Sequence, residues 1–279
     1  MKVLMMLSDY MLPGISLVAF WLFVSIAVII QGISKSGFAG GAGVLSLPLM
    51  MLVMPVDKVV ASLLPLLILL DFNAIYHHRH NRDWQVIRMI YPPALIGIIL
   101  GALVWWWIGR AGLASYEGYI KRFVGVIAIF LAFYILGKEL SLKWVQGKKA
   151  GRKIGWAAGL FAGFSSTIAH AAGPVVSLFV FSQDLGKTLF VGTVAWAFTL
   201  INLTKLPFYV AADLIDFSVL HFDLYLLPLV PLGSWLGKWL HHRVSEKVFN
   251  RIIMGLTLLA GIQLLFNVNL VRSFLAWFQ

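Results

Sequence analysis

The chain has 279 residues, of which 61% are hydrophobic and only 12% are charged. A soluble domain carries about 25% charged residues, so the composition excludes a soluble globular protein and predicts a membrane protein partly covered by lipid. The net charge of +11 does not indicate nucleic-acid binding, because Lys and Arg lie in short loops between apolar runs. The absence of cysteine excludes disulfides, thiol chemistry and cysteine-bound metals.

Segments without Asp, Glu, Lys or Arg predict the membrane spans. In the first half they cover residues 10–34, 36–56, 59–76 (interrupted by Asp71), 89–109 and 123–137. In the second half they cover residues 154–183, 188–210 (interrupted by Lys205), 224–237 and 252–271, and the first of these is broken near His170. Since a span needs about 20 residues, we predict an all-α polytopic bundle of eight to ten segments. The shorter ones are expected to be half-helices or re-entrant hairpins. No small-residue cleavage site follows the N-terminal apolar run, so we expect that run to stay in the mature chain.

The distribution of Lys and Arg predicts the orientation. Fourteen of the 22 fall in loops 77–88, 138–153, 183–187 and 238–251, which we place on the cytoplasmic side. Loop 211–223 contains three Asp and no basic residue, as suits the outer side. The chain is therefore predicted to be a multi-pass inner-membrane protein with both termini outside, in the periplasm. The run His77-His-Arg-His80 is interpreted as part of a basic loop rather than as a metal site.

Residues 11–145 and residues 152–272 are predicted to be two copies of one repeat. Their motifs recur in the same order: Gly37-Phe38 and Pro48 with Gly163-Phe164 and Pro174; Lys58 and Asn73 with Lys187 and Asn202; Asp83-Trp84 with Asp216-Phe217; Gly97 and Gly101 with Gly233 and Gly237. About five segments per copy is an odd number, so the second copy must be inverted relative to the first. Inverted repeats are typical of secondary transporters, whose substrate site lies where the repeats meet.

Five glycines occur among the thirteen residues from Gln31 to Gly43. Each weakens a helix by about 1 kcal/mol relative to alanine, so we expect a break that faces protein or a watery cavity. Backbone N–H groups freed there attract anions. The alternative is close helix packing through the small residues, with the Lys35 side chain reaching the cytoplasmic membrane interface. The candidate substrate-binding residues of this stretch are Gln31, Ser34, Lys35, Ser36, Gly37, Gly40 and Gly41.

The corresponding stretch of the second half, residues 163–174, contains hydroxyls and a histidine in place of glycines. His170 lies at the predicted helix break and could contact an anion or carry a proton; the alternative is a histidine that only packs. The candidates here are Ser165, Ser166, Thr167, His170 and Gly173.

Two charged residues lie inside predicted spans, where charge is costly and usually functional. Lys205 is predicted to contact substrate or a gate, unless it reaches the outer interface. Asp71 is predicted either to pair with Lys35 or to bind a coupling proton, with Asn73 beside it.

The glycine-rich stretch, its degenerate copy at residues 159–174, and the pattern Gly192-Thr193 to Asn202 and Lys205 resemble the sulfite exporter TauE/SafE family over nearly the whole chain. The resemblance implies a multi-spanning exporter of sulfite or an organosulfonate, and it adds Thr193 and Asn202 to the candidate substrate-binding residues. The family's second copy is commonly also glycine-rich, whereas this chain has hydroxyls and His170 there.

The expected function is secondary transport of a small sulfur-containing anion by alternating access. The partners expected are that anion and lipid, with a homodimer as a further option; neither a cofactor nor nucleic acid is expected. The alternatives are an anion or small-solute channel, a permease for another anion such as a carboxylate, a membrane enzyme and an assembly subunit. An enzyme is not expected, because the sequence has no catalytic triad, paired catalytic carboxylates, P-loop or dinucleotide motif.

Overall fold

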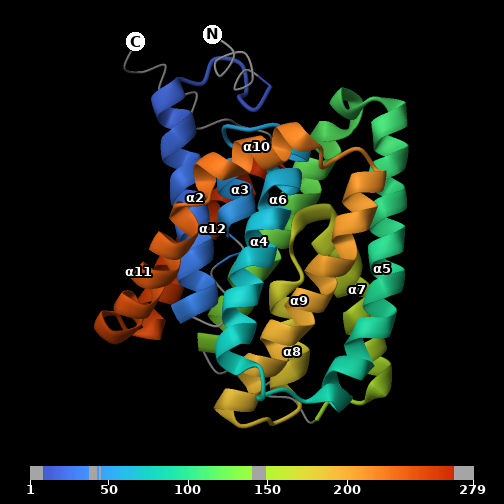
Figure 1. The fold of residues 1–279 in the computed structure, drawn as a ribbon, viewed down its shortest axis with the longest axis vertical. Helices are drawn as coiled ribbons and strands as arrows, with labels where there is room; N and C mark the ends of the chain where they lie inside the picture. Colours follow the sequence, from blue (N-terminus) through green and yellow to red (C-terminus); the bar gives the residue numbers. More distant parts are fainter. Residues whose placement is uncertain (1–8, 38–42, 44, 140–148, 267–279) are drawn as a thin grey trace.

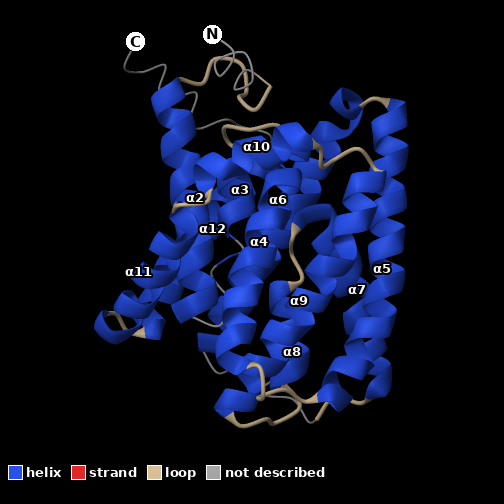
Figure 2. Ribbon diagram, in the orientation of Figure 1, coloured by secondary structure: helices blue, strands red, loops and turns tan. Residues whose placement is uncertain are grey.

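The computed structural model of the chain describes residues 9–37, 43, 45–139 and 149–266. Within these ranges the protein is all-helical and contains no strand (Figure 2). The predicted all-α class is therefore confirmed.

Eleven helices occur in the described part of the chain. They are α2 (Leu17–Gly37), α3 (Ser46–Met50), α4 (Val56–His78), α5 (Trp84–Ala111), α6 (Leu113–Glu139), α7 (Arg152–Ala169), α8 (Gly173–Phe181), α9 (Lys187–Ala211), α10 (Phe217–Leu226), α11 (Leu229–Arg243) and α12 (Glu246–Leu265). Four of those described, α2, α4, α5 and α9, are long and apolar enough to cross a membrane, and α10 with α11 forms a fifth candidate bent by 43°. The short helix α8 matches a predicted half-helix, whereas the predicted short segment 123–137 belongs to the 27-residue helix α6.

Two predicted boundaries were wrong. The first span was expected to end at Ser34, with Lys35 as a divider, but α2 continues through Lys35 to Gly37. A helix can contain this lysine because its ammonium pairs with the buried Asp71 carboxylate. The hydroxyl stretch was expected to be loop, but residues 163–169 belong to α7, and the break is limited to residues 170–172.

The closest helix packing joins helices from different halves of the chain. Helix α2 lies along α11, α5 along α7, α6 along α12 and α4 along α9. Helices α4 and α9 run in opposite directions in Figure 1, α4 downward and α9 upward. Asp83 and Asp216 cap the N-termini of α5 and α10, since each side chain accepts backbone N–H bonds.

Equivalent contacts recur 131 positions apart. Ser36 donates to the carbonyl of Gly32, and Thr167 donates to the carbonyl of Gly163. Helices α4 and α9 begin at Val56 and Lys187, again 131 positions apart. Asp71 and Asn202, whose side chains are hydrogen-bonded, are also 131 positions apart. The correspondence of Gly37 with Gly163 and of Asn73 with Asn202 stays a prediction.

Small residues permit the close approach of α5 to α7. A methyl group added at Gly97 would collide with the backbone of Leu160 and Phe164 on α7. We therefore expect Gly97→Ala to destabilise the fold by about 1–3 kcal/mol, the usual cost of overpacking. Gly109→Ala on the same helix is the matched control, since nothing lies within 4 Å of the added methyl group. Thermal unfolding in detergent should show a lower midpoint for Gly97→Ala only; equal midpoints would contradict the packing described here.

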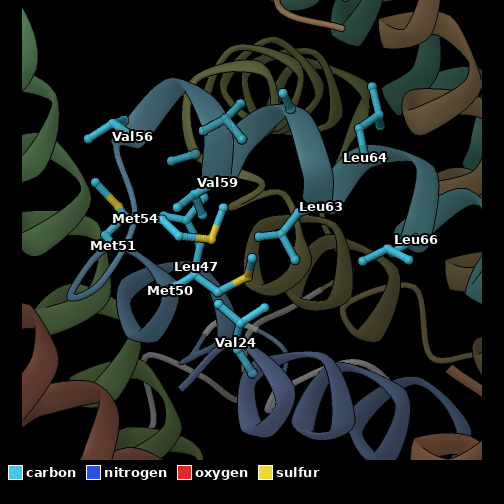
Figure 3. Close-up of a cluster of buried hydrophobic side chains, with 14 of the residues drawn as sticks. Val24, Leu47, Met50, Met51, Met54, Val56, Val59, Leu63, Leu64 and Leu66 are labelled. Atoms are coloured by element: carbon cyan, nitrogen blue, oxygen red, sulfur yellow. The ribbon is translucent and has the colours of Figure 1, made fainter. Parts of the chain in front are cut away.

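An apolar cluster holds α3 against α4. The side chains of Leu47 and Met50 point toward those of Val59 and Leu63 (Figure 3). All four are at least 97% buried. This packing fixes α3 beside the chain segment that follows α2, and so positions one wall of the cavity described next.

Candidate functional site

A small cavity lies between Gln31 of α2, Gly43, helices α3, α4 and α6, and the break between α7 and α8. Its volume is about 20 Å³, which is room for about one water molecule. The lining comes from α2, α3, α4, α6 and the α7–α8 break: Gln31, Gly43, Leu47, Pro48, Leu63, Leu67, Val124, Ile127, Ala128, Ala169, His170 and Ala171. Gln31 and Gly43 of the glycine-rich stretch and His170 of the α7–α8 break therefore line one cavity.

His170 ends α7 in a left-handed backbone conformation, with φ of 50°. Its Nε2 lies 2.8 Å from the carbonyl oxygen of Val60 on α4. A carbonyl can only accept, so this nitrogen carries the hydrogen, and Nδ1 is the acceptor in the neutral ring. The ring therefore connects the helix break to α4 and presents one edge to the cavity.

Lys205 of α9 has no exposed surface. Its Nζ donates to three acceptors: the carbonyl of Ser166 at 3.2 Å, the Ser166 hydroxyl at 3.0 Å and His170 Nδ1 at 3.0 Å. These match the three N–H groups of an ammonium. Lys205 thus holds the end of α7 and the His170 ring in place. The alternative in which Lys205 reaches the outer interface does not fit its full burial, and its contact with substrate or a gate stays a prediction.

Asp71 of α4 connects both halves of the chain. One carboxylate oxygen pairs with the Lys35 ammonium of α2, and the other accepts from Asn202 Nδ2 of α9 at 2.6 Å. Lys35 also donates to the carbonyl of Leu67 at 3.4 Å. The structure therefore pairs Asp71 with Lys35, which is one of the two roles predicted for this carboxylate. Asn73 is half-buried two residues further on and does not join these contacts.

The basic and acidic groups of this buried region are unequal in number. Lys35 and Lys205 contribute two basic groups and Asp71 contributes one carboxylate, so a cation on Lys205 would have no acidic partner. Within the described chain, Asp71 is the one acidic group paired with either lysine. An uncompensated charge in a low-dielectric interior is costly, and a bound anion would offset it.

Most predicted hydroxyls serve the backbone. Ser36, Ser165 and Thr167 donate to backbone carbonyls. Ser34 accepts from the N–H of Gly43 at 2.7 Å. Thr193 accepts from the N–H of Asp83 at 2.9 Å, far along α9 from Lys205, so the structure does not bring it to the cavity.

The remaining candidates divide into three groups. Gln31 lines the cavity, and its Oε1 is buried without a hydrogen-bond partner among the described residues. Gly37 ends α2 and Gly173 begins α8, so both flank the breaks. Gly40 and Gly41 lie outside the described residues.

Two contributions were missed from the sequence. Helix α6 supplies one apolar wall through Val124, Ile127 and Ala128, which carry no polar signal. Trp105 Nε1 and the Tyr209 hydroxyl both donate to the carbonyl of Thr167, at 2.9 and 2.6 Å. These two rings hold the last turn of α7, and a buried aromatic donor inside a span was the available signal.

A metal site receives no support from the described residues, since no group of three or more His, Asp or Glu side chains lies together there.

The family comparison is specific: residues 23–264 match the model of the family described as Sulfite exporter TauE/SafE. The chain belongs to this family of membrane transporters, and it is a multi-pass membrane protein. A search of the curated proteins and a search of the solved structures each gave no match.

Proposed function

We propose that this member of the TauE/SafE family is a secondary transporter that exports sulfite or a small sulfonate across the inner membrane. The observation that carries the proposal is the fully buried Lys205 amino group, which has no acidic partner among the described residues and contacts His170 on the wall of the cavity. An oxyanion would supply the missing negative charge and accept the N–H groups that now bond within the protein.

The cavity is closed in this conformation, since 20 Å³ does not accommodate a sulfur oxyanion. Each donor of Lys205 is used internally, by Ser166 and His170. Anion entry therefore requires the α7–α8 break to move away from α4 and α6, which exchanges internal hydrogen bonds for bonds to the anion. Saturable exchange needs such an anion-bound state of the protein.

The two halves support alternating access. The α4–α9 pair and the α6–α12 pair each contain one helix from each half. If the two halves were interchanged, the α2–α11 pair would take the place of the α5–α7 pair. Together with the opposite directions of α4 and α9, this supports inverted repeats covering residues 11–145 and 152–272. Rocking of such repeats would open the cavity to one side at a time. With both termini outside, an inside-negative potential would drive a free anion outward by about 2.3 kcal/mol per charge per 100 mV.

The proposal is tested by counterflow. Purified protein in proteoliposomes loaded with unlabelled sulfite should take up labelled sulfite from outside, and the rate should saturate. A panel of methanesulfonate, sulfate and small carboxylates would define the anion class. Uptake that rises linearly with concentration, without trans-stimulation, would indicate a channel instead. Absence of any anion flux from the purified chain would contradict the proposal.

His170→Gly separates the side chain from the backbone. Glycine adopts the left-handed conformation of this position without strain, so the helix break should persist. The ring's bonds to Lys205 and Val60 are lost. We expect exchange to fall by about 10- to 100-fold, because a hydrogen bond to a charged group contributes about 1.5–3 kcal/mol. Asp213→Gly, at another left-handed position in an exposed loop, is the matched control and should retain exchange. Full exchange by His170→Gly would remove this residue from the site.

A further inference from the structure

Asp223 is a buried carboxyl that the anion site does not use. It lies on α10, which packs against the first half of α4, and its exposed fraction is 6%. Neither carboxylate oxygen has a hydrogen-bond partner in the described part of the chain. The Ser62 hydroxyl of α4 faces it but is also left without a hydrogen bond of normal geometry.

The neighbouring elements supply no cation to this carboxyl. Helix α4 contributes Asp57 and Lys58 near its start, and the Lys58 ammonium lies over the Tyr10 ring, 5.4 Å from its centroid. The segment before α2 contributes Asp9 and Tyr10; burial is the main cause that raises the pKa of Tyr10, so this phenol stays neutral. Helix α2 contributes Phe20 and Trp21, which pack on Phe222.

Other titratable groups near or on α10 are Asp216, which caps the helix, together with His221 and Tyr225, whose exposed rings contact each other edge to face. No ion pair between described residues reaches Asp223. A carboxyl buried without a cation, with one hydroxyl facing it, is favoured in the form that holds its own proton.

The same stretch of α4 touches both this carboxyl and the anion cavity. Ser62 faces Asp223, Leu63 lines the cavity, and the carbonyl of Val60 accepts from His170. Movement of this stretch would therefore change the surroundings of Asp223 and of the cavity together. The sequence places this end of α4 and α10 toward the outside.

We propose that Asp223 is the proton site of a proton–anion antiporter. During export its carboxyl takes up a proton from outside water when the outer half is open, holds it while the cavity is closed, and gives it up on the cytoplasmic side, where the anion then binds. The closed cavity has no room for the anion, so the proton-loaded and anion-loaded forms exclude each other. Mutually exclusive occupancy gives exchange, whereas cotransport would need both ligands in one closed form. This inference rests on the proposed anion transport and names its coupling ion.

The test uses methanesulfonate, a strong-acid anion whose own charge does not change with pH, with the membrane potential held at zero by potassium and valinomycin. Vesicles that are more acidic inside should accumulate the anion. In Asp223→Asn, which keeps the shape of the neutral acid, the ratio of acid-driven uptake to exchange at equal pH should fall at least about tenfold, within the usual 5- to 150-fold range of coupling between sites. Asp213→Asn is the matched control, because it removes an exposed carboxyl at a left-handed position that asparagine tolerates.

An unchanged ratio in Asp223→Asn would overturn the inference, as would accumulation only when the lumen is alkaline. If the wild type exchanges no anion, the proposed transport is contradicted, and this inference fails with it. If the variant does not fold, wild-type protein can be treated at neutral pH with a hydrophobic carbodiimide, which adds to protonated carboxyls in apolar surroundings. Labelling of Asp223 that the anion suppresses is the expected result; an unlabelled Asp223 contradicts the proposal.

Discussion

Lys205→Met is expected to abolish anion exchange while leaving the protein folded. Methionine has nearly the length of lysine and fills irregular buried space, so packing around α9 should survive. The lost ammonium is the charge that the anion would offset, and it also holds Ser166 and His170. Losing one partner of a buried charge interaction costs about 2–5 kcal/mol, which corresponds to a decrease of at least about 30-fold in exchange.

The matched control is Lys187→Met, which removes an exposed lysine at the start of the same helix. Labelled-sulfite counterflow and thermal unfolding are to be measured on both variants. Because a cation on the buried Lys205 would have no acidic partner, Lys205→Met should unfold at the same temperature as the wild type or above it. Exchange at the wild-type rate by Lys205→Met would show that this ammonium does not act in transport.

The second large effect concerns stability. Asp71→Asn should lower the free energy of unfolding by about 3–5 kcal/mol, since it leaves the Lys35 ammonium buried without a counter-ion. The double variant Lys35→Met with Asp71→Leu removes both charges and should recover most of that loss. Asn202→Leu is a smaller perturbation, because the Lys35 pair remains.

Thermal or denaturant unfolding of the single and double variants completes a double-mutant cycle for Lys35 and Asp71. Additive losses in the double variant would contradict a direct interaction between the two side chains. Recovered stability without recovered exchange would show that the pair also serves transport, since either charge can be dispensable for folding and still be needed for movement.

The sequence predicts the class of fold well, because long apolar runs leave few solutions in lipid. It also locates the two breaks, since glycines at residues 32–43 and the Gly-Pro pair at residues 173–174 both disfavour continuous helix. Pairing of Lys35 with Asp71 was one of two alternatives, and only the packing of α2 on α4 decides between them.

Other features depend on packing that residue letters do not encode. The hydroxyls of Ser165 and Thr167 were expected to face substrate, but in a helix they bond to carbonyls one turn back. The apolar wall from α6 carries no chemical signal. The close helix approaches at Gly97 and Gly233 likewise depend on what lies across each helix crossing.

The most direct test of the central claim, that the anion binds in the cavity between the two breaks, uses the absence of cysteine in the chain. Ala128→Cys places a thiol on the cavity wall, and Ala111→Cys places one on the exposed end of α5. Both should react with a negatively charged, membrane-impermeant methanethiosulfonate reagent in exchange-competent protein. Sulfite should protect Ala128→Cys but not Ala111→Cys. Equal labelling of Ala128→Cys with and without saturating sulfite would contradict an anion site in this cavity.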